Sequence, residues 1–469
     1  MQKYELPDQL CDAGAFMMRP LQPTAFSDRP LSLLTPAVQE DFANIAAIEL
    51  IENGDRPARE NWQTRQVTNL LRHAQAHSKF WRERMPSRMI NHEVMKHLPV
   101  LTREDIASQV NREGSLATTD GAAPMTYSST GSTGTPVKVY ITPQNSYYNK
   151  VRYIAQFFID DLSLDERRML IGPPISLTHL KKGGVGTKSA DSWAGPLAKL
   201  FLNGSDKTVT HLYDDDALIE ELSKDRADYL VCHSRIMDII LRKAGAELIK
   251  GLGVKIWFHV SDYRDPEVVE ALAEIGVPSL SNYSAGEMGP IAFECRERQG
   301  FYHVAHSNVV VELDDQLTTT FNGVTVGRLL VTHLHSYATP IIRYDLGDFG
   351  QLESRCPCGH DGPTLSNIYG RGKHFLRHPN GNLVPFYLST RALLGVVPGF
   401  TECRVRQNEV EAIDVELGGR ESITEEEKGN LTKLMLAATD PAFKVRVKTV
   451  RHIDWSENPK RLLFSSSVV

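Results

Sequence analysis

Residues 127–140, Y-S-S-T-G-S-T-G-T-P-V-K-V-Y, restrict what this chain can fold into more than any other stretch. Every residue from 128 to 135 is Ser, Thr or Gly, so the stretch offers many hydroxyl and backbone N–H donors and few bulky side chains. A loop that folds over a polyphosphate needs these properties. It is not a Walker A loop, because no Gly-Lys-Ser/Thr follows the glycines at the required offset. Val137, Val139 and Tyr140 predict a strand directly after it; the alternative is a Ser/Thr-rich linker.

Length, charge and cysteine content limit the classes of protein that need to be considered. A chain of 469 residues favours two or three domains, and 41% hydrophobic content is enough for a large core. A net charge of −6 without a long basic run argues against nucleic acid as a main partner. No apolar run is long enough to span a membrane, and the first residues lack the apolar core of a signal peptide. Six cysteines in such a chain predict no disulfide scaffold, so we expect a cytoplasmic protein whose cysteines are free to bind metal.

The hydrophobic pattern changes several times along the chain. Residues 1–37 read as an arm, and residues 38–110 show helical periodicity. Short β-branched runs then alternate with helical patterns, which predicts a largely parallel sheet. The expected strands lie at 169–171, 229–231 and 254–260, and the expected helices at 216–222, 235–244 and 265–275. Residues 308–350 instead predict strands joined by Gly and Asn turns, in a small barrel-like part.

A boundary near residues 371–373 divides off the last part of the chain. There, strand-like pieces at 401–407, 410–417 and 443–450 flank a helical pattern at 424–438. We therefore predict an α/β fold with a large N-terminal domain of mostly parallel sheet plus a small β-barrel-like part, and a small α+β C-terminal domain. The expected division is a helical part at 1–110, a core at 111–371 and a C-terminal domain at 372–469.

Cysteine and histidine residues form a separate pattern. Cys356-Pro357-Cys358-Gly359-His360 is a C-x-C-G turn, and Cys295, His303 and His306 lie upstream. A close Cys pair on a Gly/Pro turn is a common half-site for zinc, which prefers thiolate and imidazole ligands in tetrahedral geometry. We predict a structural Zn²⁺ site formed by Cys295, His303, Cys356 and Cys358. Which of His303, His306 and His360 supplies the histidine ligand is left open, and four unrelated buried residues are the alternative.

Four stretches, in order, resemble motifs of the adenylate-forming superfamily, which includes acyl-CoA synthetases, peptide-synthetase adenylation domains and luciferases. The first is the loop at 128–135. Residues 281–287, S-N-Y-S-A-G-E, resemble its aromatic-Gly-x-Thr/Ser-Glu motif, and residues 340–348, P-I-I-R-Y-D-L-G-D, resemble its Tyr-Arg-Thr-Gly-Asp motif. Residues 369–373, Y-G-R-G-K, resemble its hinge motif.

Within this superfamily, two early stretches resemble the phenylacetate–CoA ligase branch. They are residues 71–83, which resemble its early helix, and residues 98–105, L-P-V-L-T-R-E-D. The resemblance as a whole covers about residues 60 to 460. It implies the adenylate-forming enzyme fold, with a C-terminal domain that rotates between two half-reactions.

The resemblance also implies roles for individual residues. Catalytic roles fall to Lys460, Glu287 and Arg371, and Glu287 would hold Mg²⁺. Tyr283 would pack on adenine, and Asp348 would accept hydrogen bonds from the ribose hydroxyls. The remaining candidates for binding ATP or AMP are Ser129, Thr130, Gly131, Ser132, Thr133, Gly134, Thr135, Ser261, Asp262, Asn282, Ser284 and the hinge residue Lys373. Alternatives are a core role for Tyr283, a plain surface role for Lys460 and a turn-forming role for the nearby Asp345.

These roles predict an ATP-dependent ligase that activates a small-molecule carboxylic acid as acyl-AMP and passes it to a thiol, with coenzyme A favoured. Trp257, Phe258 and Tyr263 favour an aromatic acid. An amine or a carrier protein is the alternative acceptor, because Pro379-Asn380-Gly381 predicts a tight hairpin where the resembling branch forms its pantetheine tunnel. A nucleotide-binding module without turnover is the alternative of another class. The oligomeric state is left open, with a homodimer among the alternatives.

Overall fold

The computed structural model describes residues 35–86, 90–110, 115–117, 125–128, 137–172, 185–195, 200–260, 264–321, 324–370, 375–454 and 463–468. The predicted helical segment is confirmed. It contains α1 (Pro36–Glu52), α2 (Arg56–His77), α3 (Lys79–Arg82), a 3₁₀ turn η4 (His92–His97) and α4 (Arg103–Gln109). Local sequence sets these ends. Asp55 caps α2 through the Ala58 N–H, and Thr102 and Asp105 form a reciprocal capping box on α4.

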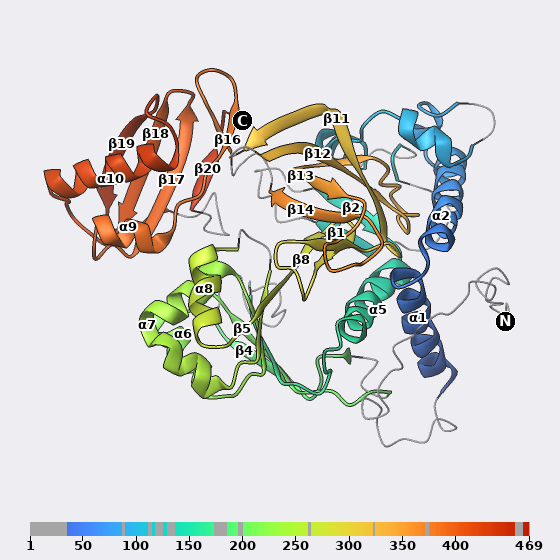
Figure 1. Cartoon of the computed structure of the whole chain (residues 1–469), viewed down its shortest axis with the longest axis horizontal. Helices are drawn as coiled ribbons and strands as arrows, with labels where there is room; N and C mark the ends of the chain where they lie inside the picture. The colour runs from blue at the N-terminus through green and yellow to red at the C-terminus, as the bar shows by residue number, and fades with distance from the viewer. Residues whose placement is uncertain are drawn as a thin grey trace.

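A sheet of twelve strands runs through the centre of the molecule (Figure 1), in the order β11-β12-β13-β14-β10-β9-β8-β7-β6-β3-β5-β4. Its parallel half agrees with the predicted alternation of strands and helices. The strands are β3 (Arg168–Gly172), β5 (Asp206–Thr210), β6 (Tyr229–Cys232), β7 (Ile256–His259) and β8 (Ser279–Ala285), with β4 (Thr187–Ala190) antiparallel at the edge. Their helices are α6 (Asp215–Leu222), α7 (Ser234–Leu252) and α8 (Pro266–Glu274).

Side chains that alternate along β7 pack on opposite faces of this half. Trp257 is fully buried in the core shared with α6, α7 and α8. Phe258 faces the other way, with its ring 5.5 Å from that of Phe157 on α5 (Pro143–Ile159). Such alternation is the geometric consequence of the strand period of two. Trp257 is therefore a core residue and does not line an acyl pocket, contrary to the expectation from sequence, whereas Phe258 lies in an aromatic cluster.

The predicted barrel-like part is the antiparallel half of the same sheet. β8 pairs in parallel with β7 on one side and antiparallel with β9 on the other, so the sheet changes direction at β8. The antiparallel strands are β9 (Gly289–Glu294), β10 (Tyr302–Val304), β11 (Val309–Phe321), β12 (Val324–His333), β13 (Tyr344–Glu353) and β14 (Thr364–Tyr369). The N-terminal helices pack on this half: Trp81 is fully buried and donates its indole N–H to the Pro340 carbonyl at 2.9 Å.

A two-stranded hairpin carries the loop rich in Ser, Thr and Gly. β1 (Met125–Ser128) pairs antiparallel with β2 (Lys138–Ile141), so the strand predicted after the loop is confirmed. Residues 129–136, which form the loop itself, lie outside the described residues. Because Ser128 pairs with Lys138, the two ends of the loop are adjacent.

The C-terminal part has its own sheet and core (Figure 1). Its four strands are β17 (Glu402–Glu409), β18 (Ala412–Gly418), β19 (Lys444–Val450) and β20 (Phe464–Ser466), with the helices α9 (Thr390–Val396) and α10 (Glu425–Ala438). The predicted hairpin is present between β15 (Phe375–Arg377) and β16 (Leu383–Pro385), where Gly381 adopts a φ of 91°. No helix among the described residues is long and apolar enough to cross a membrane.

Candidate nucleotide site and metal centre

Tyr283 and Asp348 come from two separate motifs and meet in the structure. Tyr283 lies near the carboxyl end of β8 and Asp348 in the middle of β13. The Tyr283 hydroxyl donates a hydrogen bond to Asp348 Oδ2 at 2.5 Å. Asp348 is only 7% exposed, while the Tyr283 ring is half-buried and packs against the antiparallel core. The contact brings together the residues that the sequence predicts for adenine and ribose.

Asp345 is a second carboxylate in the same motif as Asp348, and it has a different role. Its Oδ1 accepts a hydrogen bond from the Gly347 N–H at 2.7 Å, and its Oδ2 accepts one from Arg328 Nη1 at 3.0 Å. Gly347 has a φ of 79°, which places it in the left-handed region that glycine adopts readily. Asp345 thus shapes the turn, as its alternative interpretation predicted.

Glu287 lies in the turn between β8 and β9 and is 1% exposed. Its Oε1 is 3.4 Å from Arg103 Nη1, and its Oε2 has no hydrogen-bond partner among the described residues. A buried carboxylate is costly unless it is paired, and a buried oxygen without a partner calls for an explanation such as a bound ion. The geometry of Glu287 is therefore suited to holding a cation such as Mg²⁺.

Arg103 was not among the residues predicted for the site. It is the first residue of α4, where the helix dipole disfavours a cation. Arg103 directly follows the N-cap residue Thr102. The sequence itself therefore shows a cation at an unfavourable helix position, which can mark a residue with a role other than helix stability. What the sequence could not reveal is its partner, which lies 184 residues away.

Gly286 brings the loop hairpin close to the Glu287 turn. A Cβ atom added at Gly286 would lie 1.8 Å from the Tyr127 hydroxyl and 2.3 Å from the ring carbon that carries it. Tyr127 belongs to β1, the strand that leads into the loop at 129–136. Glycine at this position thus allows two of the predicted motifs to approach each other.

The other predicted nucleotide residues are placed only in part. Asn282 and Ser284 lie on β8 next to Tyr283, where Asn282 is half-buried and Ser284 is exposed. The remaining candidates lie outside the described residues: Ser129, Thr130, Gly131, Ser132, Thr133, Gly134, Thr135, Ser261, Asp262, Arg371, Lys373 and Lys460.

Three thiols and one imidazole come together as the sequence predicted for a metal site. The potential ligand atoms of Cys295, His303, Cys356 and Cys358 all lie within 4.8 Å of one another. Cys295 follows β9 and His303 lies in β10, whereas Cys356 and Cys358 lie in the connection between β13 and β14. The group therefore joins the ends of two hairpins. Gly359 supports the C-x-C-G turn with a φ of 97°.

The protonation chemistry of this cluster suits zinc. Burial lowers the pKa of His303 to about 4, which keeps the imidazole in the neutral form that coordinates metals. Burial also raises the pKa of Cys356 to about 12, so the empty cluster would hold thiols. A coordinating metal reverses this preference, since it deprotonates its thiol ligands.

The structure also separates the three candidate histidines. The His303 Nε2 atom lies 3.4 Å from Cys358 Sγ. His360 stacks on His303 with ring centroids 4.2 Å apart, and His306 lies behind His360 at 5.9 Å. His303 is thus the histidine in the group, and the other two are packed beside it.

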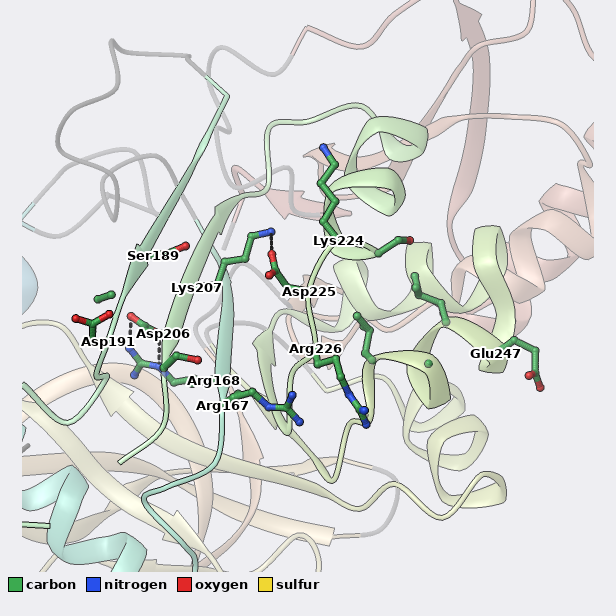
Figure 2. A pocket seen from close by; sticks show the side chains of 16 residues that line it. Arg167, Arg168, Ser189, Asp191, Asp206, Lys207, Lys224, Asp225, Arg226 and Glu247 are labelled. Atoms are coloured by element: carbon green, nitrogen blue, oxygen red, sulfur yellow. Dashed lines mark hydrogen bonds and ion pairs between the residues drawn. The ribbon is translucent and has the colours of Figure 1, made fainter. Parts of the chain in front are cut away.

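A cavity of about 800 Å³ lies at the amino ends of β3 and β5 in the parallel half of the sheet (Figure 2). Its charged side chains are largely paired with one another: Arg168 contacts Asp206 at 2.9 Å, and Lys207 contacts Asp225 at 2.5 Å. Leu252 at the end of α7 also lines it, and the carboxyl end of a helix repels anions. The cavity is therefore a poor site for a polyphosphate, and ligands of such sheets bind at the carboxyl edge.

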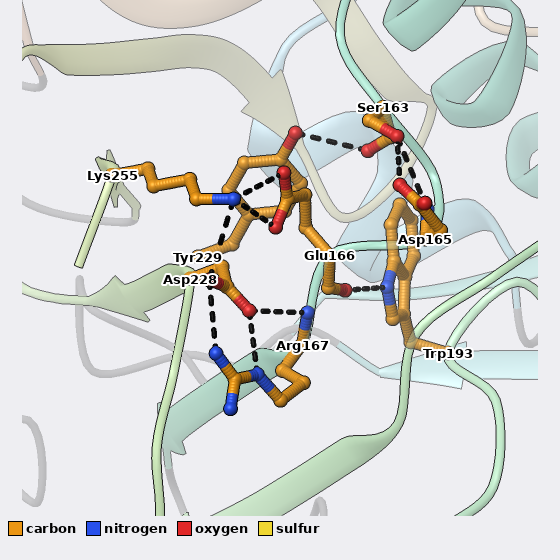
Figure 3. Close-up of polar contacts among 8 residues, drawn as sticks. All are labelled: Ser163, Asp165, Glu166, Arg167, Trp193, Asp228, Tyr229 and Lys255. Atoms are coloured by element: carbon orange, nitrogen blue, oxygen red, sulfur yellow. Dashed lines mark hydrogen bonds and ion pairs between the residues drawn. The ribbon is translucent and has the colours of Figure 1, made fainter. Parts of the chain in front are cut away.

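Ion pairs also tie the strands together at this amino edge (Figure 3). Arg167 contacts Asp228 through Nε at 2.6 Å and Nη2 at 3.1 Å, and Lys255 contacts Glu166 at 2.6 Å. Burial alone would raise the pKa of Asp228, but hydrogen bonds from Arg167 outweigh it and lower this pKa to about 2. These contacts are structural and lie away from Tyr283 and Asp348.

Comparisons with known proteins place the fold. No protein-family model matches the sequence, and the curated proteins give no match. The structure is similar to 2-hydroxyisobutyryl-CoA ligase in the postadenylation state with 2-HIB-AMP, with a TM-score of 0.61 and 13% identity over 86% of this chain and 88% of that one. The same ligase with 2-HIB-AMP and CoA in the thioesterification state gives 0.55 and 14%, over 89% and 92%. GH3.15 acyl acid amido synthetase gives 0.51 and 12%, over 87% and 88%.

These likenesses define the class of the fold. The chain has the fold of the adenylate-forming enzymes, and the fold predicted from its sequence motifs is confirmed.

Proposed function

We propose that this protein is an ATP-dependent ligase that activates a small-molecule carboxylic acid as acyl-AMP and releases pyrophosphate. The observation that carries this proposal is the Tyr283–Asp348 hydrogen bond of 2.5 Å. The buried Glu287 lies in the turn that directly follows β8, the strand of Tyr283. Tyr283 and Asp348 thus meet although they come from two separate motifs, and Glu287 follows Tyr283 by four residues in the first of these motifs. The neighbours in fold include a CoA ligase with a bound acyl-AMP, which supports the same chemistry.

In the first half-reaction, a carboxylate oxygen of the acid attacks the α-phosphorus of ATP and pyrophosphate leaves. The loop at 129–135 would donate hydroxyl and N–H groups to the β- and γ-phosphates. Asp348 would accept hydrogen bonds from the ribose, held in place by Tyr283, whose ring would pack on adenine. Glu287 would hold Mg²⁺, whose charge would stabilise the departing pyrophosphate. Ser261, Asp262, Asn282 and Ser284 would complete the nucleotide site.

The second domain would supply the remaining groups. We propose that residues 372–469 act as a lid that rotates between the two half-reactions, with Arg371 and Lys373 at the hinge. Lys460 would approach the α-phosphate during adenylation. The C-terminal part has its own hydrophobic core and its own four-stranded sheet, which supports the view that it moves as a unit.

The acyl group would then pass to a thiol, with coenzyme A favoured. A fold neighbour with bound CoA in a thioesterification state supports this acceptor. A carrier protein would use the same thiol chemistry. An amine is the second candidate, because the β15–β16 hairpin follows the hinge and an acyl acid amido synthetase shares the fold. Both acceptors start from the same acyl-AMP.

We also propose a structural Zn²⁺ bound by Cys295, His303, Cys356 and Cys358. The mutual spacing of the four ligand atoms and the neutral imidazole fit a closed tetrahedral site. The bound zinc would hold the β9–β10 hairpin to the connection between β13 and β14. Because four protein ligands fill its tetrahedral positions, the zinc would have no open position for substrate. The segments at 71–83 and 98–105 support placement near the phenylacetate–CoA ligase branch.

ATP–pyrophosphate exchange without CoA tests the proposal directly. A panel of aromatic, aliphatic and amino acids should contain one class that supports exchange. CoA and amines are then added to the active acid to identify the acceptor. Binding of ATP without exchange for any acid would contradict the enzyme and favour a nucleotide-binding module.

A further inference from the structure

Glu287 lies in a short turn whose shape is fixed at both ends. Ala285 of β8 pairs with Gly289 of β9, so the turn between the two strands spans residues 286–288. The Met288 N–H donates to the Ala285 carbonyl at 3.1 Å, and Gly289 has a φ of 78°. Hairpin turns of this length commonly end in a left-handed glycine, which sets the path of the backbone. The direction of the Glu287 side chain therefore depends on how firmly the residues after it are held.

Asn308 holds this turn from inside the protein. It is fully buried at the end of the connection between β10 and β11. Its Nδ2 atom donates to the Met288 carbonyl at 3.1 Å and to the Pro290 carbonyl at 2.6 Å. Both hydrogens of the amide are thus used on the backbone that directly follows Glu287. Because a buried carbonyl that loses its partner is costly, these two bonds keep the turn in one conformation.

The connection that carries Asn308 is itself held by two buried charges. Arg152 of α5 donates through Nη2 to the Ser307 carbonyl at 2.9 Å and through Nε to the Ser307 hydroxyl at 3.0 Å. Glu52 of α1 accepts the Ser307 N–H at 2.8 Å and the His306 N–H at 2.9 Å. Buried charges are costly unless they are hydrogen-bonded, and here both are bonded to the same short stretch of chain. Asn308 therefore projects from a rigid base.

We propose that Asn308 is a positioning residue for the Mg²⁺ that enters with ATP: it fixes the turn so that the Glu287 carboxylate is aimed at the metal. This inference rests on the proposed function, in which Glu287 holds Mg²⁺, and adds the group that orients this carboxylate. Glu287 Oε2 has no hydrogen-bond partner among the described residues, so its direction depends on the backbone that carries it. Groups that hydrogen-bond behind a metal ligand raise metal affinity in this way, because they remove other orientations of the ligand.

A comparison of ATP binding with and without Mg²⁺ isolates this contribution. Asn308→Leu keeps the approximate size of the side chain and removes its donors. Calorimetric titration should show that Mg²⁺ strengthens ATP binding about 10-fold less in this variant than in wild type, because the carboxylate is no longer held in place. AMP affinity in EDTA should stay within about twofold of wild type, since Tyr283 and Asp348 lie outside the turn.

A double-mutant cycle shows whether Asn308 acts through Glu287. Glu287→Gln alone should remove most of the strengthening by Mg²⁺. Glu287→Gln/Asn308→Leu should bind ATP with Mg²⁺ no more weakly than Glu287→Gln, because the positioning residue has no carboxylate left to orient. Additive losses would mean that Asn308 affects ATP binding by another route, which contradicts the proposal.

Gln63→Met is the matched control. Gln63 of α2 donates through Nε2 to the His306 carbonyl at 2.9 Å and to the Val309 carbonyl at 3.1 Å. The variant therefore also removes two hydrogen bonds to the connection that carries Asn308. It should lower the melting temperature, as Asn308→Leu does, but leave the effect of Mg²⁺ within about twofold of wild type. An equal loss in both variants would attribute the effect to a loosened connection and overturn the proposal.

The outcomes also separate this inference from the proposed function. If Mg²⁺ strengthens ATP binding equally in Asn308→Leu and wild type, the positioning role is wrong while the proposed function stands. If the wild-type protein binds neither ATP nor AMP, the proposed function fails and the inference fails with it. Should thermal melting show that Asn308→Leu is unfolded, Asn308→Ser, which keeps a hydroxyl donor, takes its place and should show a smaller loss of the same kind.

Discussion

Tyr283 and Asp348 are joined by a hydrogen bond of 2.5 Å across 65 residues of sequence. One comes from the strand where the central sheet changes direction, and the other from the antiparallel strand β13. Because Asp348 is nearly buried, this hydroxyl is a main constraint on the direction in which the carboxylate points. The contact gives a first test of the candidate nucleotide site.

Tyr283→Phe should keep the aromatic ring and remove only the hydroxyl. We expect AMP affinity to fall about 3- to 10-fold, because a hydrogen bond to a charged group contributes about 1.5–3 kcal/mol and part of it is regained from water. Calorimetric titration with AMP measures this loss. Tyr283→Leu should lose more, since the ring would also be missing. Equal affinities for Tyr283→Phe and wild type would mean that the hydroxyl does not orient Asp348.

Asp348→Asn should abolish detectable adenylation and weaken AMP binding about 100-fold, because an amide offers one acceptor where the carboxylate offers two. Asp345→Asn is the matched control three residues away. It should lower the melting temperature through its lost contacts with Gly347 and Arg328, but leave AMP affinity within about threefold. If the two substitutions affect AMP binding equally, Asp348 is not the ribose-binding residue.

Cys356→Ser should reduce bound zinc from one equivalent to near zero and lower the free energy of unfolding by about 2–5 kcal/mol. Metal content by mass spectrometry and urea unfolding measure the two effects. Cys403→Ser is the matched control, because Cys403 is buried in the C-terminal core away from the cluster. It should lower stability and leave zinc content unchanged. Unchanged zinc in Cys356→Ser would exclude the proposed ligand set.

Acid should weaken the amino edge of the parallel sheet through Asp228. The pKa of Asp228 is lowered to about 2 in the folded protein from its ordinary value of 3.8, so the folded state favours the ionised form. The stability from this group is therefore fully present above about pH 4 and is lost as the pH falls towards 2. We expect Asp228→Asn to be about 1 kcal/mol less stable than wild type at pH 6, allowing for the partly exposed Arg167, and to converge with it near pH 2. Urea unfolding as a function of pH measures this difference, and a constant gap at all pH values would contradict it.

Much of the fold could be read from the sequence because its segments carry strong periodic patterns. Runs such as Tyr229–Cys232 alternate with amphipathic helices, and the C-terminal strands and helix were predicted within a few residues. The continuity of the central sheet was not predictable in this way. β8 reads S-L-S-N-Y-S-A and has no apolar alternation, because its place is set by pairing on both sides. β20 is three residues long, which is too short for a periodic signal.

The candidate site divides along similar lines. Tyr283, Glu287 and Asp348 could be identified because each lies in a compact motif. The choice of His303 over His306 and His360 needed the register of β10 against β9 and β14, which no spacing rule contains. The contact of Arg103 with Glu287 was missed because it joins distant segments, and the sequence shows only that Arg103 begins a helix.

The change of direction at β8 also bears on how such a protein diversifies. Under the proposed function, Tyr283 on β8 and Asp348 on β13 hold the nucleotide, whereas Phe258, which the sequence associates with the acid, lies on β7 in the parallel half. A lineage can therefore replace one set of side chains to accept a new acid while the other set remains intact. The exception is β8 itself. Because this strand pairs with both halves of the sheet, a single substitution there affects the packing of both. We therefore expect substitutions that change the acid substrate to occur mainly outside β8 and rarely within it.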